Sequence, residues 1–132
     1  MINNMAKILV VEDDPILQKM YASKLQKEGY ETFIASDGQE GFDQAKKEMP
    51  DFILLDLMMP KTDGAAALRL LKDDEETKGI PVAILSVIPE DTQNAEDKIT
   101  LSNAVAYWRK DQNNPSEITE KIKDCLNNKT TS

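Results

Sequence analysis

Five short apolar runs, each followed by a segment with helical spacing, constrain the fold of this chain more than any other feature. The runs predict strands at residues 6–11, 31–35, 51–56, 80–86 and 104–108. The intervening and following segments predict helices at residues 15–28, 37–49, 63–74, 89–102 and 115–126. Strands that alternate with helices favour a parallel sheet covered on both faces. We therefore predict a doubly wound α/β fold, with a five-stranded parallel sheet and five helices.

Capping residues support the ends of the first and last predicted helices. Asp14 can cap the first helix with Pro15 at its first position, and Gly29 can end it. Asn114 is the corresponding cap of the last helix. The tail after that helix, residues 127–132, is expected to fray.

Length and charge limit the classes of function. A chain of 132 residues is most simply one domain, here predicted to span 1–132 with a core at about 5–127. The 16 Lys and Arg against 24 Asp and Glu give a net charge of −8, which argues against direct nucleic-acid binding. The absence of histidine excludes histidine-based triads and phosphohistidine chemistry within the chain.

Cysteine content and hydropathy indicate the compartment. A single cysteine, Cys125, cannot form an internal disulfide bond, so a reducing compartment is the simpler interpretation. No stretch approaches the length of a signal peptide core or of a membrane span. We expect a cytoplasmic protein that does not insert into membranes.

Polar side chains gather at the predicted carboxyl ends of the strands. Glu12 and Asp13 follow the first strand, Asp56 ends the third, Ser86 ends the fourth and Lys110 follows the fifth. Ligands of such sheets bind at this edge. Clustered carboxylates suit a hard cation such as Mg²⁺, and a nearby lysine can bind a phosphate oxygen. The pattern indicates phosphoryl transfer, with a carboxylate able to accept the group as an acyl phosphate.

The chain resembles the receiver domain of two-component response regulators, which has a flavodoxin-like fold. The resemblance extends over almost the whole chain, and its most specific part is the D-x-x-M-P-x-x-D-G pattern. The matching stretches are "ILVVEDD" (8–14), "DFILLDLMMPKTDG" (51–64), "VAILSV" (82–87) and "NAVAYWRK" (103–110).

The resemblance implies an acceptor and a metal site. Asp56 corresponds to the phospho-acceptor. Glu12 and Asp13 correspond to the acidic pair, with Asp13 binding Mg²⁺ directly and Glu12 through water. The backbone carbonyl of Met58 completes the protein ligands in this interpretation.

The resemblance also implies a switch. Ser86 corresponds to the hydroxyl that contacts the phosphoryl group, Lys110 to the site lysine and Tyr107 to the switch aromatic. The chain departs from the family at Asp111, because proline commonly follows this lysine, often with a cis peptide bond. A cis bond is improbable without proline, so the loop must present Lys110 in another way.

The implied function is signalling rather than turnover of a substrate. A histidine kinase or histidine phosphotransfer protein donates the phosphoryl group, and the fourth helix, fifth strand and fifth helix contact an output protein or form a weak homodimer. Two alternatives stay open. One is a receiver-like module that signals without phosphorylation. The other is an aspartate-nucleophile phosphohydrolase, although such enzymes carry a second Asp where this chain has Met58.

Overall fold

The sheet is the organising element of the computed structural model, which describes residues 6–57, 64–87, 98 and 100–131. Its five strands are all parallel and lie in the order β2-β1-β3-β4-β5. The predicted doubly wound sheet is confirmed. The strands are β1 (Lys7–Val11), β2 (Glu31–Ala35), β3 (Phe52–Asp56), β4 (Val82–Ser86) and β5 (Ala106–Arg109).

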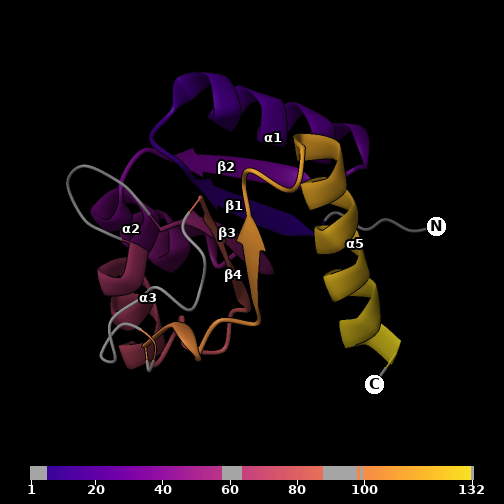
Figure 1. Cartoon of the computed structure of the whole chain (residues 1–132). Coiled ribbons are helices and arrows are strands. Elements are labelled where there is room, and N and C mark those ends of the chain that lie inside the picture. Colours follow the sequence, from indigo (N-terminus) through magenta and orange to yellow (C-terminus); the bar gives the residue numbers. More distant parts are fainter. Residues whose placement is uncertain (1–5, 58–63, 88–97, 99, 132) are drawn as a thin grey trace.

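Helices cover both faces of the sheet (Figure 1). Helices α1 (Pro15–Lys27) and α5 (Pro115–Thr131) pack together over one apolar cluster. Helices α2 (Gly38–Glu48) and α3 (Gly64–Asp73) pack together over the other. Strands β3 and β4 lie between the two layers and are buried along their whole length.

The predicted fourth helix, residues 89–102, lies mostly outside the described residues. Within the described part, Lys98, Thr100 and Leu101 are helical, and Leu101 is buried in the core on the α2–α3 side. Four complete helices are therefore present among the described residues, against the five that the pattern predicts.

Several predicted boundaries are confirmed. The Asp14 carboxylate accepts hydrogen bonds from the backbone N–H groups of Ile16 and Leu17, at 2.9 and 3.4 Å, and so caps α1. Gly29 follows that helix with a φ of +95°, a left-handed conformation that glycine adopts without strain.

Two predicted boundaries are wrong. Strand β5 runs from Ala106 to Arg109, later than the predicted 104–108. Helix α5 continues to Thr131, beyond the predicted end at residue 126. No glycine or proline follows Leu126, so nothing in the local sequence ends the helix there.

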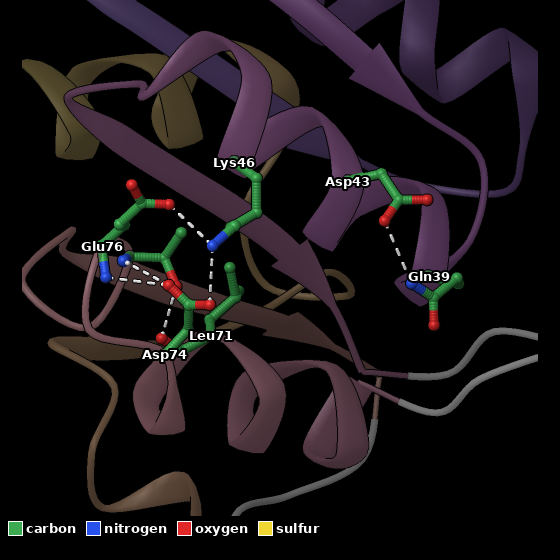
Figure 2. A network of polar contacts seen from close by, with 7 residues as sticks. Gln39, Asp43, Lys46, Leu71, Asp74 and Glu76 are labelled. Carbon is green, nitrogen blue, oxygen red and sulfur yellow. Dashed lines mark hydrogen bonds and ion pairs between the residues drawn. The ribbon is translucent and has the colours of Figure 1, made fainter.

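A polar network joins α2 to the turn after α3 (Figure 2). Lys46 of α2 lies with its ammonium 2.9 Å from Asp74 and 2.7 Å from Glu76. The same Asp74 carboxylate accepts the backbone N–H groups of Glu76 and Thr77. The Thr77 hydroxyl donates to the carbonyl of Leu71 at 2.7 Å. In the charged run after α3, Asp74 and Thr77 are therefore held against the protein, while Glu75 and Lys78 stay exposed.

None of the helices in the described ranges combines the length and the apolar character that crossing a bilayer requires.

Candidate functional site

The ends of two neighbouring strands bring three carboxylates together. Glu12 and Asp13 directly follow β1, and Asp56 is the last residue of β3. The two strands are paired, with Val11 opposite Leu55, so their carboxyl ends lie side by side. One carboxylate oxygen from each acid lies within 4.8 Å of the others.

Two of these acids are buried. Glu12 is 1% exposed and Asp56 is 3% exposed, whereas Asp13 reaches solvent. Burial raises the pKa of Glu12 to about 7, because the ionised form loses its hydration; Lys110 opposes this rise and Asp56 adds to it. A buried carboxylate pair is costly unless a cation compensates it.

Lys110 supplies part of that compensation. Its ammonium lies 2.8 Å from Glu12 Oε1 and 3.2 Å from Asp56 Oδ2. Burial on its own lowers the pKa of Lys110, but the two carboxylates outweigh burial and leave that pKa above its ordinary value. The lysine therefore reaches the acids although the proline common in the family is absent.

The donor set fits a hard divalent cation. Glu12 Oε1 is buried, and among the described residues its polar contact is the ion pair with the Lys110 ammonium at 2.8 Å. Three carboxylates against one ammonium also leave the cluster with excess negative charge. Hard oxygen ligands with unmatched charge are the chemistry that Mg²⁺ prefers.

Ser86 lies on β4, the neighbour of the acceptor strand β3, and Tyr107 lies on β5, one strand further from the acids. Ser86 ends β4 and is fully buried, and its backbone carbonyl accepts the N–H of Lys110 at 2.8 Å. Tyr107 is a half-buried residue of β5 that packs against the core on the α2–α3 side. Trp108 lies on the opposite face and stacks on Phe52, with ring centroids 6.4 Å apart, as expected for a core residue.

One predicted ligand cannot be placed. The backbone carbonyl of Met58 lies outside the described residues, so its part in a metal site stays a prediction.

The sequence did not indicate a glutamine that supports the end of β1. Gln18 of α1 donates through its side-chain amide to the backbone carbonyl of Glu12 and, at 3.0 Å, to the hydroxyl of Ser36. It thereby ties the ends of β1 and β2 to α1. A glutamine on a polar helix face resembles any solvated residue, so no sequence signal could have identified it.

Gly64 has a role that follows from the close approach of α3 to the site. A Cβ at this position would lie 2.5 Å from Leu57 Cα and 2.6 Å from the Asp56 carbonyl oxygen. Its N–H also donates to the carbonyl of Leu57 at 2.7 Å. Only glycine lets the helix begin this close to the acceptor strand.

The residues flanking Lys110 pair with one another. Arg109 donates to both carboxylate oxygens of Asp111, at 2.9 and 2.7 Å. The peptide bond between Lys110 and Asp111 is trans. In the sequence, Asp111 differs from the family pattern, but nothing there indicates its pairing with Arg109, because two charges that flank one residue in a turn form no regular pattern.

A doubly wound sheet with an acidic pocket at its carboxyl edge defines a class of α/β domain whose site is compatible with aspartate phosphorylation and Mg²⁺. Comparison with known proteins identifies the family. The sequence matches the response regulator receiver domain over residues 8–123, and the chain belongs to that family.

Relatives and solved structures agree with this assignment. The polar-differentiation response regulator DivK of Brucella abortus is 33% identical over 119 residues, covering 90% of this chain and 94% of the relative. Protein PilH of Pseudomonas aeruginosa is 36% identical over 103 residues, covering 73% and 85%.

Among solved structures, a CheY-like receiver domain protein from Methanospirillum hungatei has a TM-score of 0.81 and 27% identity, covering 97% of this chain and 98% of that one. The response regulator TrrA of Thermotoga maritima, solved in complex with Mg²⁺-BeF, has a TM-score of 0.77 and 27% identity, covering 91% and 98%. The predicted fold and family are confirmed, and the relatives are signalling proteins.

Proposed function

We propose that Asp56 accepts a phosphoryl group from a phosphohistidine on a histidine kinase or phosphotransfer protein. A carboxylate oxygen of Asp56 forms the new bond to phosphorus while the phosphorus–nitrogen bond breaks, and the imidazole nitrogen keeps the electron pair. The observation that carries the proposal is the burial of Asp56 among two further acids with a lysine 3.2 Å away.

We propose that the same cluster holds Mg²⁺. Asp13 and Asp56 are the direct ligands in this proposal, Glu12 acts through water, and the Met58 carbonyl completes the set. When bound, the cation neutralises charge on the phosphoryl oxygens and on the carboxylates.

The remaining site residues act on the phosphorylated form. Lys110 is placed to bind a phosphoryl oxygen, since its ammonium already contacts Asp56. Ser86, at the end of the neighbouring strand, donates a hydrogen bond from its hydroxyl to a second phosphoryl oxygen. Tyr107 then moves with Ser86, which shifts a pre-existing two-state equilibrium.

Helix α1 offers a surface for the phosphodonor protein. A groove of about 540 Å³ on this helix is lined by exposed Ile16 and Met20 together with Lys19, Lys24 and Lys27. The helix begins directly after the acidic pair, so a partner on this groove lies next to the site. Exposed apolar side chains ringed by charge are typical of a protein interface.

We further propose that the chain acts in the cytoplasm as one receiver domain over residues 1–132, with its core at about 5–127. Output passes to a protein partner through the surface of the predicted fourth helix (residues 89–102), β5 and α5, which can also form a weak homodimer. Direct nucleic-acid contact is not expected for a chain of net charge −8.

Phosphorylation by a small phosphodonor tests the acceptor. We expect the protein to gain the mass of one phosphoryl group in acetyl phosphate with Mg²⁺, and to lose this gain in Asp56→Asn. Asp51→Asn is the matched control, because Asp51 precedes the same strand at its opposite end. No gain in the wild type, or an equal gain in Asp56→Asn, would refute the proposal and favour a module that signals without phosphorylation.

A further inference from the structure

The turn between β5 and α5 carries Lys110 without the proline common in the family, and the structure shows what holds it instead. Arg109 forms a two-pronged contact with Asp111, at 2.9 and 2.7 Å. The backbone carbonyl of Arg109 accepts the N–H of Gln112 at 3.3 Å and the side-chain amide of Asn113 at 2.9 Å. Each of these three contacts involves Arg109.

These contacts lie on either side of Lys110 in the sequence. The side chains of Arg109 and Asp111 bond to each other, while the ammonium between them contacts Glu12 and Asp56. A lysine has four rotatable side-chain bonds, so its reach depends on how firmly its backbone is fixed. The backbone N–H of Lys110 is bonded to Ser86 at 2.8 Å, which is the other fixed point.

We propose that Arg109 and Asp111 are positioning residues, which hold the turn so that Lys110 reaches the acceptor carboxylate. Neither touches the phosphoryl group. A proline would stiffen this turn by fixing a backbone angle. Here the two charge-assisted hydrogen bonds between Arg109 and Asp111 restrict the turn instead, and hydrogen bonds of this kind are the strongest between side chains. This inference rests on the proposed phosphorylation of Asp56.

Asp111→Ala should lower the rate of labelling by acetyl phosphate only modestly, and the direction of the change distinguishes positioning from charge. The two side chains are 23% and 49% exposed, so the pair is partly screened by solvent. Losing it should slow labelling by acetyl phosphate about two- to fivefold. Removing a negative charge near an anionic phosphodonor should on its own raise the rate. A slower rate in Asp111→Ala therefore indicates positioning rather than charge.

The test is a double-mutant cycle between Asp111 and Lys110. The labelling rate with acetyl phosphate and saturating Mg²⁺ is measured for Asp111→Ala in the wild-type and Lys110→Ala backgrounds. We expect the two- to fivefold loss only where Lys110 is present. Gln112→Ala, in the same turn with an exposed side chain that makes no hydrogen bond to the described residues, should label at the wild-type rate. Equal losses in both backgrounds, or an equal loss in Gln112→Ala, would overturn the proposal.

A measurement independent of phosphorylation separates failure of this inference from failure of the proposed function. Amide hydrogen exchange at Lys110 should speed up about two- to fivefold in Asp111→Ala and stay unchanged in Gln112→Ala. Unchanged exchange in both variants contradicts the positioning role, even where Asp56 is phosphorylated. If the wild type is not labelled at all, the acceptor assignment fails while the exchange result still decides the role of the pair.

Discussion

Glu12 is a buried acid whose ionised form is costly in the folded protein. It lies 1% exposed beside Asp56, and it is stabilised by the Lys110 ammonium and by the backbone N–H of Asp14, which donates to its other oxygen at 3.1 Å. Its pKa is raised to about 7 because burial disfavours the ionised carboxylate. The native protein therefore keeps a proton on Glu12 at pH values where the unfolded chain has released it.

Because the folded state retains this proton, the stability of the protein without Mg²⁺ should depend on pH. The ordinary pKa of Glu12 is 4.5 and the folded value is about 7, so the folded state binds more protons in this window. The free energy of unfolding should therefore fall as pH rises from about 5 to about 7, by up to about 3 kcal/mol from this group. Urea denaturation with a chelator present, at a series of pH values, measures the effect.

Glu12→Gln is the control for this titration, since its amide cannot ionise. The fall in stability between pH 5 and pH 7 should be smaller in Glu12→Gln than in the wild type. The titration of Lys110 does not contribute to the stability difference between pH 5 and pH 7, because its raised pKa affects stability only at high pH. Parallel curves for the two proteins would show that Glu12 is already ionised at pH 5.

Single residues also show where sequence reasoning reached its limit. Asp56, Glu12 and Asp13 could be grouped because parallel strands deliver their last residues to one edge. Nothing in the sequence shows that Glu12 is more buried than its neighbour Asp13, since burial depends on what packs around the strand end. The support from Gln18 and the pairing of Asp111 likewise arise only from the folded chain.

At the level of elements, the junction of β3 and α3 depends on the absence of a side chain at Gly64. Gly64→Ala should lower the free energy of unfolding by about 1–3 kcal/mol, because its Cβ would meet backbone atoms of Asp56 and Leu57 at 2.5–2.6 Å. Thermal or urea denaturation measures this loss.

Gly79→Ala is the matched control for the junction. A Cβ at Gly79 meets nothing within 4 Å, so the change in stability should stay within about 0.5 kcal/mol. Equal losses in both variants would mean that backbone flexibility, and not the close approach of α3, explains the effect at Gly64.

The contact between α2 and the turn after α3 should depend on salt. Lys46→Ala removes the ion pairs with Asp74 and Glu76, which lie at the surface. The variant should unfold at a lower urea concentration than the wild type in low salt, and the difference should shrink in 1 M NaCl, where the Debye length is about 3 Å. Lys47→Ala, which removes a neighbouring exposed lysine, should show no such trend. A difference that persists in high salt would indicate packing rather than charge.

The elements themselves were largely predictable, for identifiable reasons. The strands at 31–35 and 51–56 are short apolar runs between turn residues, and the helix from Pro15 has both a cap and a glycine end. The sequence predicts too early a start for β5, because Ala104 and Val105 are apolar but lie in the turn before the strand. The sequence predicts too short an α5, because the residues after Leu126 are polar and place no apolar side chain at helical spacing.

For the whole molecule, the chemistry of the site and the recognition of the phosphodonor depend on different residues. Ile16 is 71% exposed in the α1 groove, whereas the acids lie beyond the end of β1. A change at Ile16 should therefore affect transfer from a protein donor without altering the acceptor.

Ile16→Asp tests this separation. Transfer from the phosphorylated histidine phosphotransfer protein that labels the wild type fastest should slow at least tenfold, because roughly 1.4 kcal/mol is lost when a central apolar contact is replaced by a charge. Labelling by acetyl phosphate should not change. Met49→Asp, a change at another exposed apolar residue, 46% exposed and following α2, is the control. Equal slowing in both variants, or slower labelling by acetyl phosphate, would contradict the assigned surface.

The central claim is that Asp56 forms an acyl phosphate, and chemical trapping tests it most directly. Borohydride reduces an aspartyl phosphate to homoserine, so the modified position is recorded permanently in the peptide. After treatment with acetyl phosphate and Mg²⁺, peptide mapping should find homoserine at Asp56 alone, and a chelator should abolish it. Homoserine at Asp13 or another acid, or none at Asp56 in a protein that has gained a phosphoryl group, would contradict the account.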